Sequence, residues 1–462
     1  MARFNLTRRG FIAGSTAALS IRPTWAASPE VLTARKTRVQ LAPVGYPQTE
    51  VWEYGGTLPG RTIRVKQGER VTRRLENELD VPTSIHWHGI RIDNAMDGVA
   101  GLTQDAVPPG QSFDYNFVAP DAGTYWYHAH TNSMEQVARG LSGPLIVEEA
   151  EAPDVDADEV LMLDDWLIDP DTGQFFDDFN QPMTLSHGGR MGNLIGTNGQ
   201  YQLELPVTSG ARLRLRLINA ANARIFVLRL QGLTGWTVAL DGMPLATPEP
   251  VMDEIVLAPA QRVDLIVDVT APEGETAALL RFDDDDQWRG QVAFPVDGTR
   301  SGIKRERPAA LSPNPNTAQP DLTGARSLDM VMEGGAMGRF DTASYNGRDM
   351  GFRELMGLGQ FWSLAGQVGM SDTPFAALKK GEVVRIKIDN RTVFPHAMHL
   401  HGMHFREVVA GENLGPLRDT ILSIPGETTD IVFVADNPGK WLLHCHMLGH
   451  AASGMTTWID VA

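Results

Sequence analysis

The chain has 462 residues, of which 42% are hydrophobic and 21% charged, a composition ordinary for a globular protein of two to four domains. Its formal net charge is −17, and no basic stripe interrupts this acidity, so a nucleic-acid partner is not expected. The single cysteine excludes an internal disulfide bond.

Residues 1–27 have the order of a secretory signal peptide. Arg8 and Arg9 precede a short apolar run at 10–21, and small residues follow near Ala26. The apolar run is too short to cross a bilayer, and paired arginines are typical of the twin-arginine export route. We therefore expect the folded chain to be exported to the periplasm without a membrane anchor.

After this segment the sequence is typical of β structure, and one unit occurs three times. Short runs rich in Val, Ile, Leu and Thr alternate with polar residues and end at turn signals. GERVTRRLEN, ARLRLRLIN and EVVRIKIDN contain such runs, which end at Asn77, Asn219 and Asn390, nine residues after a glycine in each case. The repeat predicts three sandwich or barrel domains, at 38–150, 155–300 and 326–462.

The first copy continues with two His-x-His pairs. His86 and His88 lie in HWHG, and His128 and His130 lie in HAH. Residues i and i+2 of a strand point to the same face, so each pair presents two imidazoles side by side. One such pair is weak support for a metal site, because strand histidines are often ordinary core or surface residues.

The middle copy has no histidine at the matched positions. Leu228 and Leu230 stand nine and eleven residues after Asn219, where the first copy has His86 and His88. We expect this domain to hold no metal. The segment 301–325 that follows is rich in proline and polar residues, which is typical of an interdomain linker.

The third copy repeats both pairs. HAMHLHG contains His399 and His401, and HCHMLGHAASGM contains His444 and His446. Four pairs at matched places in two of three repeats indicate one shared site between the first and third domains. Eight imidazoles exceed the roughly four ligands of a zinc ion, and they suit a cluster of several metals such as copper.

The only cysteine indicates a second metal site. Because Cys445 stands between His444 and His446, its side chain points to the opposite face of the strand. A thiolate, two imidazoles and a weak thioether form a blue-copper set, for which the candidates are Cys445, His450, Met455 and His396. The matched residues of the first copy lack such a set: Thr83, Ala129, Met134 and Arg139.

Taken in order, HWHG, HAH, HAMHLHG and HCHMLGHAASGM resemble the four copper motifs of three-domain multicopper oxidases, from about Val39 to the C-terminus. The resemblance implies an all-β chain of three cupredoxin-like Greek-key domains with four copper ions. By motif, the type 1 copper ligands would be His396, Cys445 and His450, with Met455 axial. The type 2 ligands would be His86 and His399, and the type 3 ligands His88, His128, His130, His401, His444 and His446.

The resemblance implies an enzyme that takes single electrons from a reducing substrate at the type 1 copper and reduces O₂ to water at the cluster. Cys445 would pass the electrons to the cluster. Asp97, in DNAMDG, matches a family aspartate that aids proton delivery, although an Asp-Gly turn explains it equally well. Ala451 stands where many bacterial members have an acidic residue, so one proton route is missing or rebuilt.

Two substrate classes are compatible with the sequence. A laccase-like enzyme oxidises phenols and aromatic amines at an open groove near His450. The alternative is a periplasmic cuprous oxidase, and Asp419 matches a position near the substrate in such enzymes. Soft thioethers also suit Cu(I), but we expect most of the six methionines between Met330 and Met370 to fill the core.

A non-enzymatic copper-binding or structural relative is a further alternative. Such relatives lose ligand histidines, whereas all twelve motif positions are filled here. Two histidines do not follow the repeat: we expect His404 to be a packing residue or to support a ligand, and His187 to lie in a loop. We expect the protein to act as a monomer.

Overall fold

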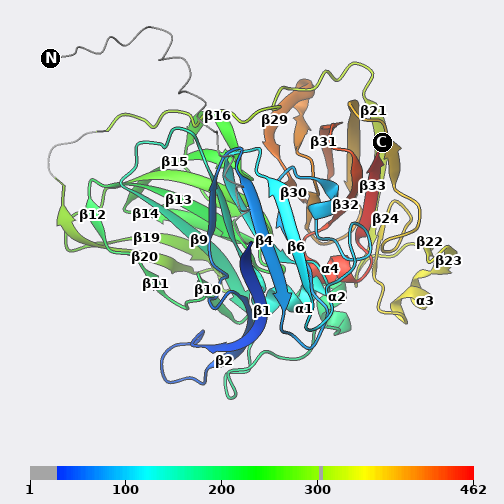
Figure 1. The fold of residues 1–462 in the computed structure, drawn as a ribbon, viewed down its shortest axis with the longest axis horizontal. Helices are drawn as coiled ribbons and strands as arrows, with labels where there is room; N and C mark the ends of the chain where they lie inside the picture. Colours follow the sequence, from blue (N-terminus) through cyan, green and yellow to red (C-terminus); the bar gives the residue numbers. More distant parts are fainter. Residues whose placement is uncertain (1–28, 301–304) are drawn as a thin grey trace, which may run out of the picture.

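The computed structural model describes residues 29–300 and 305–462, and its sheets form three pairs that follow one another along the chain (Figure 1). The predicted all-β class is confirmed, because the described helices are only three to six residues long. The predicted signal peptide lies outside the described residues. Within the described ranges, no helix combines the length and apolar character needed to cross a membrane.

The first sheet pair contains the segment with the first two histidine pairs. Its two four-stranded sheets have the orders β2-β1-β4-β6 and β3-β8-β7-β5. The strands are β1 (Glu30–Val39), β2 (Thr49–Tyr54), β3 (Ile63–Lys66), β4 (Arg70–Asn77), β5 (Ile85–His88), β6 (Ser112–Val118), β7 (Gly123–Ala129) and β8 (Ser142–Glu148).

The middle sheet pair has the orders β10-β9-β13-β18-β15-β16 and β11-β20-β19-β14-β17, with β12 also pairing with β20. Its strands are β9 (Ala157–Trp166), β10 (Leu194–Thr197), β11 (Leu203–Glu204), β12 (Val207–Ser209), β13 (Arg212–Asn219), β14 (Phe226–Gln231), β15 (Leu233–Leu240), β16 (Met243–Pro250), β17 (Ile255–Leu257), β18 (Arg262–Val269), β19 (Thr276–Phe282) and β20 (Trp288–Thr299).

The third sheet pair has the orders β24-β21-β26-β31-β28-β29 and β25-β33-β32-β27-β30, and a hairpin of β22 and β23 extends from it. Its strands are β21 (Arg326–Gly334), β22 (Thr342–Tyr345), β23 (Arg348–Gly351), β24 (Trp362–Leu364), β25 (Ala376–Leu378), β26 (Glu382–Asn390), β27 (His396–Leu400), β28 (Phe405–Val409), β29 (Asn413–Arg418), β30 (Thr420–Ser423), β31 (Thr428–Ala435), β32 (Gly439–Cys445) and β33 (Thr456–Val461).

The short helices lie in the connections: α1 (Ser133–Ala138), α2 (Pro182–Ser186), α3 (Phe352–Met356), α4 (Leu448–Ala452), and the 3-10 turns η1 (Asn94–Met96) and η2 (Ala410–Glu412). Helix α4 contacts both α1 and α2, β7 contacts β13, and β16 contacts β29. Each sheet pair therefore contacts the other two. The division of the chain into domains at the expected boundaries stays a prediction.

The asparagine of the repeat has the same structural role in all three copies. Asn77, Asn219 and Asn390 are buried, and the amide group of each donates to two backbone carbonyls. The side-chain oxygen of each accepts the backbone N–H two residues later. This turn directs the chain from one sheet to the next strand, which carries His86 in β5, Leu228 in β14 and His399 in β27.

Candidate metal centres

Two pairs of neighbouring strands position the eight paired histidines. In the first sheet pair, β5 and β7 are antiparallel with His86 opposite His128. In the third, β27 and β32 are antiparallel with His399 opposite His444. Strand alternation places both histidines of a His-x-His pair on one face, so each strand pair presents four imidazoles to the other sheet pair.

The eight imidazoles converge into one buried cluster. Nε2 of His401 lies 3.2 Å from Nε2 of His444, and Nε2 of His446 lies 3.4 Å from Nε2 of His128. The ring nitrogens form two groups of three, in which every pair of ligand atoms lies within 4.8 Å: His88, His128 and His446, and His130, His401 and His444. Each group takes residues from both outer sheet pairs, which agrees with a shared site.

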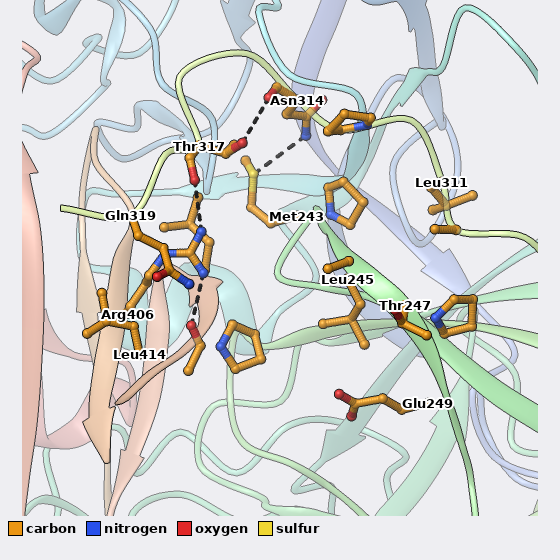
Figure 2. Close-up of a pocket in the computed structure, with 18 of the residues that line it drawn as sticks. Met243, Leu245, Thr247, Glu249, Leu311, Asn314, Thr317, Gln319, Arg406 and Leu414 are labelled. Carbon is orange, nitrogen blue, oxygen red and sulfur yellow. Dashed lines mark hydrogen bonds between the residues drawn. The ribbon is translucent and has the colours of Figure 1, made fainter. Parts of the chain in front are cut away.

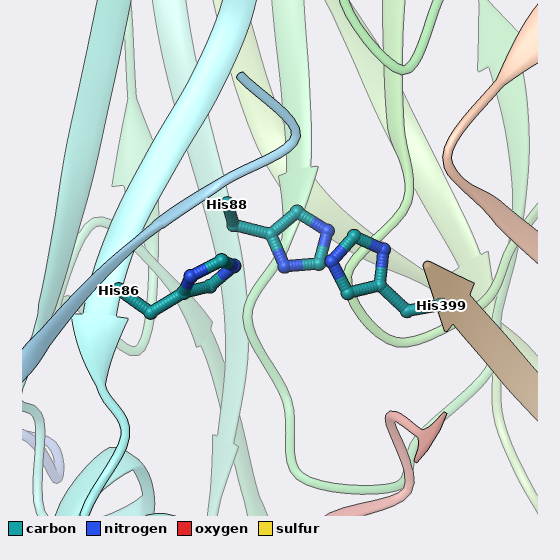
Figure 3. Close-up of side chains that lie close together, drawn as sticks. All are labelled: His86, His88 and His399. Carbon is teal, nitrogen blue, oxygen red and sulfur yellow. The ribbon is translucent and has the colours of Figure 1, made fainter. Parts of the chain in front are cut away.

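A third group consists of His86, His88 and His399 (Figure 3). The rings of His88 and His399 are stacked, with centroids 3.8 Å apart. Nε2 of His86, Nε2 of His399 and Nδ1 of His88 are buried and have no hydrogen-bond partner. Buried polar atoms normally have a partner, so these nitrogens fit a bound metal ion.

Burial keeps six of the eight cluster imidazoles neutral. It lowers the pKa of His130 to about 3 and, together with the neighbouring imidazoles, lowers the pKa of further cluster histidines well below the usual value: His88, His128, His401, His444 and His446. A neutral imidazole has a free nitrogen lone pair, which is the form that binds a metal.

Asp97 lies beside the cluster. The carbonyl of Asp97 accepts a hydrogen bond of 2.8 Å from Nδ1 of His86, and its carboxylate lies 3.0 Å from Nδ1 of His401. Both histidines therefore direct Nε2 toward the cluster. The proton-delivery role expected for Asp97 stays a prediction.

The place near the reducing substrate that is expected for Asp419 stays a prediction. Asp419 is fully buried against the cluster, with its carboxylate 3.3 Å from Nε2 of His88 and ion-paired with Arg262 at 2.6 Å. Burial alone would raise the pKa of this carboxyl, but Arg262 and the histidine hydrogen bonds hold it well below its usual range. The Arg-Asp-Thr motif gave no sign of this burial, because Arg262 belongs to a distant strand.

The candidate type 1 residues lie on the other face of β32. Nδ1 of His396 and Nδ1 of His450 lie 3.7 Å and 3.8 Å from Sγ of Cys445. All three side chains are fully buried, and Met455 is buried in the same core. Nε2 of His396 is hydrogen-bonded to Thr392, and Nε2 of His450 donates to the carbonyl of His187, so both Nδ1 atoms face the sulfur.

Burial raises the pKa of the Cys445 thiol to about 12 and lowers the pKa of His450 to about 4. Metal binding must therefore displace the thiol proton, whereas the imidazole is already in its binding form. One thiolate, two imidazoles and a nearby thioether are the donors of a blue-copper site. The residues present fit copper at this position.

Comparison with known proteins decides the family. Models of the multicopper oxidase family match residues 35–152, 158–281 and 348–462, which together exceed half of the chain.

The chain belongs to the multicopper oxidase family.

Solved structures and a curated relative agree with this assignment. A multi-copper oxidase from Pseudomonas thermotolerans is 33% identical, with a TM-score of 0.82 over 94% of this chain and 99% of that one. Lac15 from a marine microbial metagenome is 41% identical, with a TM-score of 0.75 over 94% and 100%. Copper resistance protein A of Pseudomonas syringae pv. tomato is 28% identical over 97% of this chain and 98% of its own length.

As a multicopper oxidase, the chain is a copper-dependent oxidoreductase that uses O₂ as electron acceptor, and its domains are cupredoxin-like. His450 is fully buried beneath the carbonyl of His187, and the open groove expected near it stays a prediction. His404 is buried as well, 3.6 Å from the carboxylate of Asp419, and its expected role as a packing or ligand-supporting residue stays a prediction.

The six methionines between Met330 and Met370 in this multicopper oxidase divide equally between core and surface. Met330, Met332 and Met350 are buried, as expected for core filling, whereas Met337, Met356 and Met370 are exposed. The expectation that most of them fill the core was therefore too broad. Exposure of thioethers depends on loop geometry, which residue spacing does not reveal.

An open cavity of about 800 Å³ lies away from the predicted ligands, between β16, the segment at 307–319, and β28 with β29 (Figure 2). The guanidinium of Arg406 crosses it and donates to the carbonyls of Thr317 and Gly415. None of the predicted copper ligands of this multicopper oxidase lines the cavity, so it is separate from the candidate metal centres.

Proposed function

We propose that the chain holds four copper ions and couples one-electron oxidation of phenols or aromatic amines to four-electron reduction of O₂ to water. The proposed ligands of the type 1 copper are His396, Cys445, His450 and Met455, and those of the type 2 copper are His86 and His399. The proposed ligands of the two type 3 coppers are His88, His128, His130, His401, His444 and His446. The carrying observation is that two groups of three imidazoles, and two further orphaned imidazole nitrogens, converge beside Cys445.

The bound coppers would supply the redox chemistry, and the chain supplies its layout. Cys445 is joined through the backbone to His444 and His446, so a short covalent path connects the proposed type 1 site with the cluster. Asp97 touches Nδ1 of both His86 and His401 with its carboxylate, at 3.2 Å and 3.0 Å, and this supports a role in proton delivery to the cluster. We also propose that the chain has three domains, at 38–150, 155–300 and 326–462, and that it acts as a monomer.

The signal-like residues 1–27 support export through the twin-arginine route, with the periplasm as the place of action.

Copper loading tests the proposed metal sites. We expect about four coppers per chain by metal analysis, a blue absorption band from the type 1 site, and O₂ uptake with a phenolic substrate. The chelated, copper-free protein is the control and should be colourless and inactive. A colourless protein after loading would overturn the type 1 assignment, and about one copper per chain would overturn the cluster.

One observation favours Cu(I) as a second candidate substrate. Met183 in α2 and Met337 have side chains 66% and 75% exposed, and the backbone of Ala336 binds the carbonyl of Ser186 in the same region. His187 follows directly and contacts His450. Exposed thioethers near the proposed electron entry suit a soft ion such as Cu(I).

The two substrates are separated by replacing exposed and buried methionines. Met183→Leu combined with Met337→Leu should slow Cu(I) turnover and leave phenol turnover unchanged if Cu(I) binds there. Met332→Leu, at a fully buried position, is the matched control, because Leu and Met have similar volumes. Equal loss on both substrates would count against a dedicated Cu(I) site.

A further inference from the structure

The middle sheet pair contributes none of the predicted copper ligands, yet one of its side chains reaches the cluster. Arg262, the first residue of β18, is fully buried. Its two terminal nitrogens donate to the two carboxylate oxygens of Asp419 at 2.8 Å and 2.6 Å. This paired geometry fixes the plane of the carboxylate as well as its position.

Gln261, the residue before Arg262, contacts Thr420, the residue after Asp419. Nε2 of Gln261 donates to the carbonyl of Thr420 at 3.0 Å, and its side-chain oxygen accepts the backbone N–H of Ala258. The consecutive residues Gln261 and Arg262 of the middle sheet pair thus form hydrogen bonds with two consecutive residues of the third sheet pair, Thr420 and Asp419. The start of β30 and the residue before it are therefore both held by the middle sheet pair.

Asp419 and Thr420 in turn contact histidines from both outer sheet pairs. The carbonyl of Asp419 accepts a hydrogen bond of 2.9 Å from Nδ1 of His399, and the hydroxyl of Thr420 lies 3.1 Å from the same nitrogen. The carboxylate of Asp419 lies 3.3 Å from Nε2 of His88. The nitrogens left over, Nε2 of His399 and Nδ1 of His88, are the ones that are buried without a partner.

The glycine of HWHG makes room for this ion pair. Gly89 has a φ of +85°, and a Cβ at this position would overlap the guanidinium of Arg262 and lie 2.6 Å from Oδ2 of Asp419. The matched Gly402 of HLHG instead faces the ring of Trp441. The two motif glycines therefore have different neighbours, and the ion pair is specific to one side of the cluster.

We propose that Gln261 and Arg262 are positioning residues of the copper cluster, which hold Asp419 and Thr420 so that His88 and His399 each present one fixed nitrogen to the metal. This inference rests on the proposed cluster ligands. It gives the middle domain a part in the copper chemistry although that domain supplies no ligand.

Arg262→Lys is the main test, because lysine keeps the charge and loses the paired geometry. We expect the blue type 1 absorption to remain, the type 2 electron paramagnetic resonance signal to change, and copper affinity of the cluster or O₂ reduction to fall about 10- to 100-fold, as for other residues that orient metal ligands. Copper per chain and the resonance signal are read independently of activity.

Arg214→Lys is the matched control. Arg214 is a fully buried arginine of the same sheet, paired with Asp264 and Glu149 at 2.6 Å and 2.8 Å. Its replacement damages a comparable ion pair away from the predicted ligands, so the type 2 signal should stay as in the wild type. If both variants change the signal equally, Arg262 acts through general stability and the proposal is wrong.

Gln261→Leu is a second test of the positioning role, for the case in which Arg262→Lys does not fold. It removes the hydrogen bond to the Thr420 carbonyl and the one from the backbone N–H of Ala258, and leaves the Arg262–Asp419 ion pair in place. It should therefore shift the type 2 signal in the same direction by a smaller amount. A wild-type signal in the folded variants would overturn the positioning role and leave the proposed function standing. A wild-type chain that binds copper without a type 2 signal would overturn the cluster assignment and, with it, this proposal.

Discussion

The first and third sheet pairs differ from the middle one in what their matched strands carry. Strand β5 carries His86 and His88, and β27 carries His399 with His401 directly after its end, whereas β14 of the middle pair carries Leu228 and Leu230. The turn asparagine and the strand pairing are the same in all three copies. The fold therefore does not depend on the histidines, and the middle copy shows what the unit looks like without them.

A second difference separates the two outer copies. Cys445 lies opposite Met398 in the third copy, and Ala129 lies opposite Ile85 at the matched place in the first. Both cysteine and alanine are fully buried in the cores of their own sheet pairs. Cys445 and Ala129 thus occupy one of the four matched positions at which a copy with a proposed type 1 site differs from one without.

We expect the largest effect from removing the thiol of Cys445, which the first copy lacks. Cys445→Ser should abolish the blue absorption and reduce oxidase activity to background, because a serine hydroxyl does not replace the thiolate. Absorption spectroscopy and O₂ uptake measure both. Ala129→Ser is the matched control and should keep colour and activity, with a stability cost of about 1–3 kcal/mol for the buried hydroxyl.

The pH dependence of stability should follow the histidines of the outer copies. Nine of them have a lowered pKa, so they stay neutral in the folded chain and take up protons on unfolding below about pH 6.5. The copper-free chain should therefore be fully stable above about pH 6.5 and lose roughly 1.4 kcal/mol per pH unit for each such histidine as the pH falls toward 4.

Urea unfolding of the copper-free chain between pH 7.5 and 5 measures this effect. Copper loading should move the decline to lower pH, because metal and protons compete for the same nitrogens. A midpoint that does not change over this range would contradict the neutral state of the buried histidines.

Adding a histidine to the middle copy tests whether the leucines at its matched positions are what prevents metal binding there. Leu228→His should leave the number of coppers per chain unchanged, because no second histidine set faces β14. It should destabilise the chain by about 3 kcal/mol, since Leu228 is fully buried in the middle core. Metal analysis and chemical unfolding test the two parts, and Leu230→His, at a half-buried position, should cost less. A fifth copper would contradict this account.

The smallest effect concerns a backbone difference between copies. Ala260 has a φ of +70°, where the matched Gly110 and Gly426 have +73° and +75°. A left-handed alanine costs roughly 1–2 kcal/mol, and glycine recovers part of this but adds freedom to the unfolded chain. Ala260→Gly should therefore stabilise the protein by less than about 1 kcal/mol in thermal unfolding. A loss of stability would show that alanine is favoured by packing.

The predictable part of the site lies in patterns repeated along the chain. The spacing from Asn77 to His86 recurs from Asn390 to His399, and strand alternation alone separates Cys445 from His444 and His446. These features need only local geometry. The grouping of imidazoles agrees with the ligand sets implied by the motifs, whose metal assignments stay predictions.

The parts that were missed depend on contacts between distant strands. The burial of Asp419 follows from Arg262, which is 157 residues away in the chain, and the cover over His450 comes from His187. Exposed Met337 and buried Met332 are only five residues apart. No periodic pattern encodes such contacts, because the approach of one sheet pair to another decides them.

The pairing of β27 with β32 has a consequence for how this protein tolerates change in length. His399 faces His444 and Met398 faces Cys445 across the ladder. Inserting or deleting one residue before His444 would exchange the two faces of β32, sending the thiol to the interface and the imidazoles into the core. We therefore expect substitutions in this strand to damage one copper centre at a time, whereas a change of a single residue in its length would eliminate both.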